Sequence, residues 1–286
     1  MDRTRASAIG RRLTPAIWAI LPAAVVVGLL MVGGLSVALV DSLSGASAFE
    51  NFRLVLTAPG FGASLLLSLW VAGVSTLLTV LIALASAFSL RRLQSLRRFV
   101  TYIYQLPLTL PHIVVAAAGL MLLTQSGVLS RLATAIGLIS APAGFPALVF
   151  DRAGIGIIIA YVWKQVPFVG LIALSVLHGA GREYEEVART LGARPRQVIR
   201  HVLVPLVVPG LVPASIIVFA FVLGAFEVPL LLGSRYPSML SVLAYRLYTD
   251  VDISLRPQAM AMSLLIAVLV LVLTAIYRAI LSRRSA

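Results

Sequence analysis

Long apolar runs alternate with short polar segments along most of this chain. A helix needs about 20 predominantly apolar residues to cross the hydrocarbon core of a bilayer, and six runs reach that length. They lie near residues 16–40, 62–90, 99–123, 154–178, 206–233 and 258–281. The pattern predicts an all-α integral membrane protein with about six transmembrane helices.

The composition agrees with lipid as the solvent for most of the chain. Hydrophobic residues make up 60% of the 286 residues and charged residues only 12%, and the mean hydropathy is +1.03. A soluble domain of this length would have too little polar surface to cover its core. The chain has no cysteine, which excludes a disulfide scaffold and a thiolate metal site.

The arginines divide unequally between the two sides of the predicted membrane. The two termini and the segments after the second and fourth runs carry sixteen arginines, whereas the other three connecting segments carry six. Short loops rich in positive charge stay in the cytoplasm. The distribution therefore predicts cytoplasmic N- and C-termini, and it accounts for the net charge of +13 without a nucleic acid partner.

The first apolar run has some features of a cleaved signal peptide, because basic residues precede it and Ala46, Ser47 and Ala48 have the form of a cleavage site. Its apolar part exceeds the roughly 7–15 residues of a signal peptide, which favours a retained helix. We therefore divide the chain into three regions. They are a cytoplasmic N-terminus with the first helix and outer loop (1–61), a core of five helices (62–281) and a cytoplasmic tail (282–286).

A polar segment, residues 179–205, separates the fourth and fifth runs and must lie in water beside the membrane. Glu183, Glu185 and Glu186 fall at the start of a predicted short helix, where the positive end of the helix dipole favours acidic side chains. An apolar stripe follows the same helix. It consists of Tyr184, Val187, Ala188 and Leu191.

The same segment carries the signals for a turn and a second helix. Gly192 stands where a helix ends with a left-handed residue, Pro195 can begin a second helix, and Pro205 marks the return to the membrane. The sequence predicts a helix–turn–helix elbow parallel to the bilayer surface. The alternative is an ordinary solvated loop with pairs four residues apart, such as Glu185 and Arg189.

The order of residues in this elbow is specific. It reads Glu186, Val187, Ala188, Gly192, Val202, Val204 and Pro205. This order resembles the EAA loop of binding-protein-dependent ABC importer permeases, which is Glu-x-Ala-x-x-x-Gly, nine residues, an aliphatic residue, one residue, and aliphatic-Pro. Val187 replaces the usual first alanine and Val204 the usual leucine, both with similar size and polarity. The six-helix layout also fits, so the resemblance covers most of the chain.

The resemblance implies a type I ABC importer permease fold, with 62–281 as the permease core, in the inner membrane of a prokaryote. In that family the short helix docks in a groove of a cytoplasmic ATPase. Glu186 and Val187 would contact the ATPase, Ala188 would permit close approach, and Gly192 would form the turn. The implied coupling set also includes Glu183, Tyr184, Leu191 and Pro205.

The chain would be a non-catalytic transport subunit. It contains no G-x-x-x-x-G-K-[ST] phosphate loop, and its only lysine is Lys164. ATP and magnesium would be used by partner subunits, and no cofactor would bind this chain directly. The implied partners are two ABC ATPase subunits, a second permease subunit in a homodimer or heterodimer, an extracytoplasmic solute-binding protein and membrane lipid.

Two charged residues, Lys164 and Glu227, lie inside predicted membrane helices. Each costs about 2.5–3.5 kcal/mol on insertion scales, so both should face the bundle interior or a water-filled path. They could form a structural ion pair or, with Trp163, line the solute path. The alternative function is a stand-alone secondary transporter or channel, with Lys164 and Glu227 as an ion relay. The three histidines are far apart and at different depths, which argues against a metal site.

Two short segments indicate a solute class. Residues 226–233, Phe-Glu-Val-Pro-Leu-Leu-Leu-Gly, and residues 161–164, Tyr-Val-Trp-Lys, look most like the polyamine-type branch of the family. Iron, sulfate, thiamine and sugar permeases share the same frame. The sequence therefore predicts import of a polyamine or another small polar or charged compound.

Overall fold

The structure is a computed structural model that describes residues 3–45, 47, 49–91 and 97–282. In chain order the α-helices are α1 (Arg3–Ser42), α2 (Glu50–Thr57), α3 (Phe61–Leu90), α4 (Arg97–Thr109), α5 (His112–Leu123), α6 (Val128–Ala135), α7 (Ile155–His178), α8 (Ala180–Thr190), α9 (Pro195–Val198), α10 (Val204–Gly224), α11 (Glu227–Leu232), α12 (Leu240–Tyr248) and α13 (Arg256–Ser282). These residues contain no β-strand, and the predicted all-α fold class is confirmed. The tail predicted for 282–286 lies outside the described residues beyond Ser282.

Six segments of the described chain are long and apolar enough to cross a membrane, the number that the sequence predicts. They are Ile20–Ser42, Phe61–Leu90, His112–Ala135, Ile155–His178, Pro195–Gly224 and Ile253–Ala279. Four of them correspond closely to predicted runs. The third and fifth differ, and in both places a proline is the cause.

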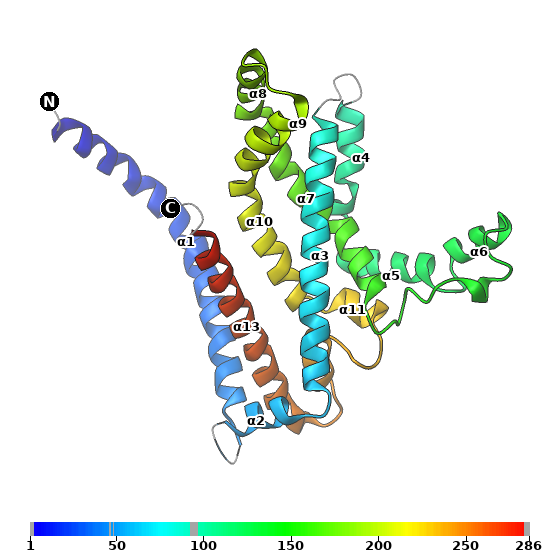
Figure 1. The fold of residues 1–286 in the computed structure, drawn as a ribbon. Helices are drawn as coiled ribbons and strands as arrows, with labels where there is room; N and C mark the ends of the chain where they lie inside the picture. Colours follow the sequence, from blue (N-terminus) through cyan, green and yellow to red (C-terminus); the bar gives the residue numbers. More distant parts are fainter. Residues whose placement is uncertain (1–2, 46, 48, 92–96, 283–286) are drawn as a thin grey trace.

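Three helices, α3, α7 and α10, pack against one another at the centre of the molecule (Figure 1). The buried face of α3 carries small side chains at helical spacing, which allow helix backbones to approach closely in a membrane. They are Ser64, Ser68, Ala72, Ser75, Thr79, Ala83 and Ala87. Tyr161 of α7 and Val218 of α10 are fully buried in the same cluster.

Helix α4 joins this core through Tyr104. The Tyr104 hydroxyl is 2.8 Å from Ser86 Oγ of α3 and donates a hydrogen bond of 3.1 Å to the Val166 carbonyl of α7. Its ring lies against Gly170, where any side chain would overlap the hydroxyl. A glycine at 170 therefore permits the close packing of α4 on α7.

A second layer contains α1, α2, α12 and α13. Helices α1 and α13 lie beside one another, with α2 at their lower end in Figure 1. Val55, Leu240 and Met262 are buried where α2, α12 and α13 meet. On α1, by contrast, Leu30 and Met31 are about 70% exposed, at 72% and 70%, which suits a helix surrounded by lipid or by another subunit.

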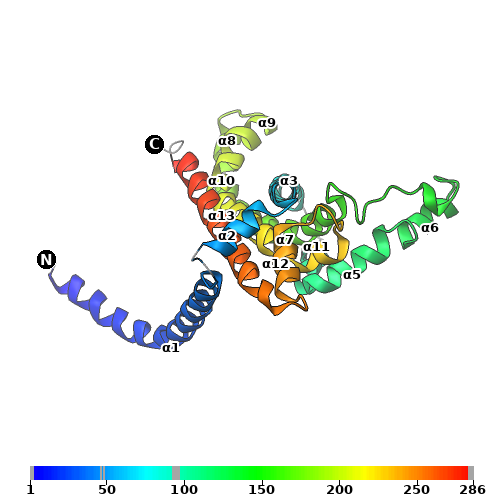
Figure 2. The same ribbon diagram turned by 90° about the horizontal axis from the view of Figure 1, so that it is seen from below.

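The third predicted run, 99–123, is not one straight helix. It breaks between α4 and α5 at Leu110 and Pro111, because Pro111 has no N–H to donate to the Pro107 carbonyl and disfavours helical backbone in the residue before it. Helix α4 packs on α7, whereas α5 and α6 run outward from the bundle (Figures 1 and 2). The segment that meets the length and apolarity of a span is His112–Ala135.

The fifth predicted run, 206–233, is displaced toward the N-terminus. Helix α9 continues through a π-helical turn, Ile199–Leu203, into α10, which ends at Gly224. Pro229 lacks the N–H that would continue the helix by bonding to the Ala225 carbonyl, and Ser241 Oγ donates to that carbonyl instead at 3.0 Å. Glu227 therefore begins the separate helix α11 and does not lie inside the fifth span.

Candidate functional site: the elbow and the interior polar side chains

The polar elbow stands at the end of the bundle where α3 and α7 finish (Figure 1). Its first arm, α8, ends with Gly192 in the left-handed region at φ +82°. The Gly192 N–H bonds to the Arg189 carbonyl and the Ala193 N–H to the Ala188 carbonyl, each at 3.0 Å. This pair of bonds is the Schellman arrangement that satisfies the last carbonyls of a helix, and it places Gly192 at the turn.

The second arm of the elbow is continuous with the fifth span. Pro195 occupies the first turn of α9. Pro205 has no N–H for the His201 carbonyl, and the Val204 N–H bonds five residues back, to the Ile199 carbonyl. The π-helical turn accommodates this proline without a break in the helix. Pro205 therefore lies within one helical segment that runs from the elbow into the membrane.

Two large apolar side chains of α8 and that of Leu191, which directly follows the helix, face outward. Tyr184 and Val187 are each 54% exposed and Leu191 is 83% exposed. Ala188, which the sequence groups with them, is half-buried and packs against the core. The predicted stripe is thus divided, with Ala188 turned toward the protein and the larger side chains away from it.

The acidic side chains of α8 also point in different directions. Glu183 and Glu186 are exposed, and Glu186 Oε1 accepts a hydrogen bond of 3.3 Å from Arg182 Nε on the same helix. Glu185 is turned inward, where its side chain is only 16% exposed. The structure therefore exposes Glu186 and turns Glu185 toward an internal contact.

That internal contact is with Arg91, at the end of α3. Arg91 Nη1 donates to Glu185 Oε2, and Arg189 Nη2 donates to Glu185 Oε1 at 2.8 Å. Burial raises the pKa of the Glu185 carboxyl, but the hydrogen bonds and charges of Arg91 and Arg189 together lower it below its ordinary value. The pairing with Arg189 follows from the spacing, whereas no local signal indicates Arg91, which is 94 residues away.

Lys164 caps the broken third segment. Its Nζ is 2.8 Å from the Pro107 carbonyl and also donates to the Leu110 carbonyl, and the residue is 5% exposed. The Pro107 carbonyl lacks its helical donor because Pro111 has no N–H, and the Leu110 carbonyl lies between the two helices, where the Val114 N–H bonds to the Pro111 carbonyl instead. No ion pair between Lys164 and Glu227 occurs in the described part of the chain, so the predicted pair is not formed.

The three predicted path residues differ in exposure. Glu227 is half-buried at the start of α11, and Trp163 is 48% exposed. Lys164 is directed into the bundle, because consecutive residues of a helix project to different sides. Trp163 and Lys164 thus project to different sides of α7, and the solute path through these three residues stays a prediction.

Two further interior side chains, His112 and Tyr161, pack against Phe221. Their ring centroids are 4.6 Å and 6.2 Å from that of Phe221. His112 Nε2 and Tyr161 Oη are buried and have no hydrogen-bond partner among the described residues. The spacing of Tyr161 and Lys164, three apart on one helix, could have indicated this cluster.

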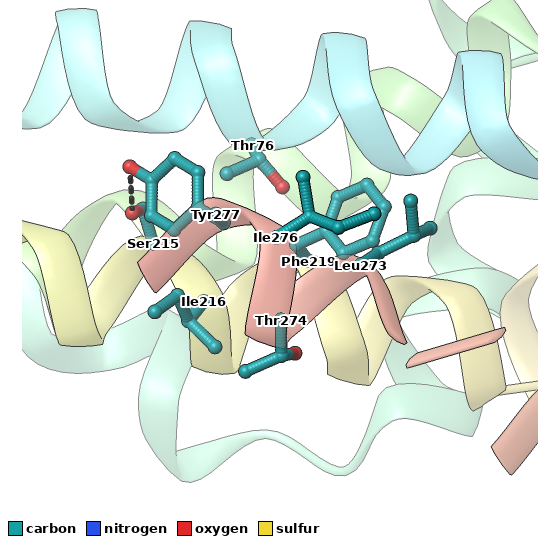
Figure 3. A pocket seen from close by; sticks show the side chains of 8 residues that line it. All are labelled: Thr76, Ser215, Ile216, Phe219, Leu273, Thr274, Ile276 and Tyr277. Atoms are coloured by element: carbon teal, nitrogen blue, oxygen red, sulfur yellow. Dashed lines mark hydrogen bonds between the residues drawn. The ribbon is translucent and has the colours of Figure 1, made fainter. Parts of the chain in front are cut away.

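A cavity of about 270 Å³ opens between α3, α10 and α13. Its lining is mainly aliphatic and aromatic, as Figure 3 shows. At one end Tyr277 Oη lies 3.1 Å from Ser215 Oγ. A hydrophilic solute would find few partners there, so this cavity is distinct in chemistry from the interior polar cluster.

The family described as the binding-protein-dependent transport system inner membrane component matches residues 79–286. The chain belongs to this family. It is therefore a multi-pass inner-membrane permease subunit of an ABC importer, and a transport protein rather than an enzyme.

Two molybdenum permeases are similar to this chain over about 70% of its length. The molybdenum transport system permease protein ModB of Mycobacterium tuberculosis is 31% identical over 212 residues, which cover 72% of this chain and 76% of the relative. ModB of Azotobacter vinelandii is 29% identical, over 69% of this chain and 84% of the relative. The names of these relatives do not include a polyamine, and the predicted polyamine-type branch is not supported.

Solved structures share the fold over nearly the whole chain. A bacterial ABC transporter involved in the import of the acidic polysaccharide alginate has a TM-score of 0.79 at 21% identity, covering 96% of this chain and 99% of the other. The alginate transporter in complex with an alginate-bound periplasmic protein has a TM-score of 0.73 at 22% identity, covering 96% and 94%. At this identity the likeness concerns the fold.

Proposed function

We propose that α8 is the site where a cytoplasmic ATPase subunit docks and drives solute movement through this permease. The observation that carries the proposal is the outward apolar face of α8, formed by Tyr184, Val187 and Leu191. Large apolar side chains grouped on a water-facing helix are typical of a helix that another protein receives in a groove. Exposed Glu186 borders this face, and Gly192 and Ala193 end the helix sharply.

The same proposal includes the rest of the transporter. Two ATPase subunits would bind ATP and magnesium, a second permease would complete the path, and a solute-binding protein would deliver the solute outside. Family membership supports this assembly, and so does the periplasmic protein bound to the alginate transporter of the same fold. A stand-alone channel or secondary transporter is not favoured by either comparison.

Both chain termini would lie in the cytoplasm. The arginine asymmetry supports this orientation. The ends of α1 and α13 that carry the termini point toward the end of the bundle that holds α8 (Figure 1). An ATPase on that side would meet α8 directly.

We infer a small oxyanion, such as molybdate or sulfate, as the solute. Molybdenum permeases are similar over more than two thirds of this chain. A segment of 72 residues is 39% identical to the sulfate permease CysT of Salmonella typhimurium. Radiolabelled molybdate and sulfate should enter proteoliposomes containing the whole transporter, and excess unlabelled oxyanion should compete where putrescine does not.

The docking role is tested by co-purification of the ATPase from membranes. Glu186→Arg reverses a charge at the edge of the docking face and should reduce the retained ATPase by about tenfold or more. Asp250→Arg makes the same charge change in the exposed outer loop and should leave retention unchanged. Undiminished ATPase retention and uptake in Glu186→Arg would exclude α8 as the docking site, and uptake without any ATPase would support the secondary transporter.

A further inference from the structure

The contact between Arg91 and Glu185 joins the elbow to a helix that is distant in sequence. The described residues contain three ion pairs, and the other two connect residues four apart within α8. The Arg91 and Glu185 side chains are only 10% and 16% exposed. A charge pair shielded in this way is weakened less by salt and water than an exposed one.

Each oxygen of the Glu185 carboxylate accepts a hydrogen bond, one from outside α8 and one from within it. Oε2 accepts from Arg91 of α3, while Oε1 accepts from Arg189, one turn further along α8. The Arg91 guanidinium also lies 5.7 Å from the centre of the Phe88 ring, which favours its position at the end of α3. Phe88 therefore helps to position Arg91, and Arg189 helps to position Glu185, for the bond between the two helices.

The other main contacts of α8 do not connect it to α3. Its packing is chiefly against α7, α9 and the π-helical turn, which are its own neighbours along the chain. Gly181, for example, lies close to Leu177 and Leu203. The pair with Arg91 extends the attachment of α8 to α3, which in turn packs along α7 and α10 in the core.

We propose that Arg91 is a positioning residue that transmits movement between α8 and α3. If an ATPase subunit moves α8, the Arg91–Glu185 pair carries α3 with it, so that the three core helices respond together. This proposal rests on the proposed docking role of α8. It adds a second connection to the continuous route from α9 into α10.

The experiment uses the whole transporter in proteoliposomes with its own solute-binding protein. The measured quantity is the ratio of ATP hydrolysis rates with and without that binding protein, which requires a signal to cross the membrane domain. Arg91→Gln should lower the ratio by about two- to thirtyfold, while the amount of bound ATPase and the melting temperature stay close to those of the unchanged protein.

Arg189→Ala is the matched control, because it removes a partner of the same carboxylate but leaves the bond between the helices. Its ratio should stay close to the unchanged value. The rescue variant combines Arg91→Glu, Glu185→Arg and Arg189→Ala, the last to avoid two guanidinium groups on adjacent turns. It restores an ion pair of opposite direction and should recover most of the stimulation lost in Arg91→Gln.

The outcomes separate the two proposals. An unchanged ratio in Arg91→Gln, or an equal loss in Arg189→Ala, would overturn the positioning role while leaving docking intact. Failure of the rescue variant, when it is folded and binds ATPase, would also overturn it. If the unchanged permease fails to bind the ATPase at all, the docking proposal itself is wrong.

Discussion

At the scale of single residues, the interior is shaped by prolines and by the side chains that compensate for them. Pro111 leaves the Pro107 carbonyl without its helical donor, and Lys164 supplies one; Pro229 does the same to Ala225, and Ser241 supplies one. Hydrocarbon contains no water to bond such carbonyls. Each break is therefore stable only because a particular distant side chain reaches it.

Lys164→Met tests this interpretation of the only lysine. Loss of the charged donor leaves the buried Pro107 carbonyl and the partly buried Leu110 carbonyl without this partner. It should destabilise the protein by about 1.5–3 kcal/mol, measured as a lower melting temperature of the purified transporter. Trp163→Phe, at the half-exposed neighbouring position, should have a much smaller effect. Normal stability combined with lost uptake in Lys164→Met would show that the lysine contacts solute instead.

At the scale of elements, the elbow is asymmetric. Its first arm, α8, is a separate helix with an outward apolar face, and its second arm is the beginning of the fifth span. The turn between them depends on Gly192, at φ +82°, where a Cβ would meet no atom within 4 Å. The requirement at this position is thus for backbone conformation and not for space.

Gly192→Val and Gly192→Asn should therefore differ. The left-handed backbone costs about 1–2 kcal/mol for an ordinary L residue, whereas asparagine adopts it more readily. Gly192→Val should weaken ATPase binding several-fold, measured by titration of the ATPase onto the permease, and Gly192→Asn should weaken it less. Equal binding by both variants would mean that the turn does not control docking.

At the scale of the whole molecule, the polar parts lie at opposite ends of an apolar bundle. The elbow lies at one end of the bundle, and α2 lies at the other (Figure 1). Because the chain has no cysteine, single engineered cysteines can report the side on which each end lies.

Arg196→Cys and Val251→Cys should show opposite accessibility. Both positions are exposed, Val251 at 98%, and the arginine distribution assigns them to the cytoplasm and the outside respectively. A membrane-impermeant maleimide should label Val251→Cys in right-side-out vesicles and Arg196→Cys only after the vesicles are opened. The reverse pattern would invert the proposed orientation.

Much of the fold could be predicted because the signals are local. Apolar runs indicate the number of spans, and Gly192 and Pro195 indicate the turn, since a glycine stop and a proline start act through their own backbone. The resemblance at Glu186, Ala188 and Pro205 indicates the family. None of these inferences needs a contact between distant residues.

The remaining features depend on such contacts. Proline occurs in several runs, but only packing decides that Pro111 breaks its helix while Pro205 is absorbed in a π-helical turn. Lys164 and Glu227 look like a pair in sequence, because both are costly in lipid. In the structure Lys164 donates to two backbone carbonyls instead, and the described residues contain no ion pair between it and Glu227.

The sequence by itself determined that this protein is an all-helical membrane protein with a polar elbow facing water, because hydropathy, charge and turn chemistry act over short distances. The resemblance of that elbow to a known family indicated a permease. Only the tertiary structure decided that Glu185 faces inward to Arg91 while Glu186 faces outward, and that α8 is attached to α3. The physical reason is that the direction of a side chain and its bonding partner depend on which helices pack together. Arg91 and Glu185 are 94 residues apart in the chain, so no local sequence pattern indicates that they pair.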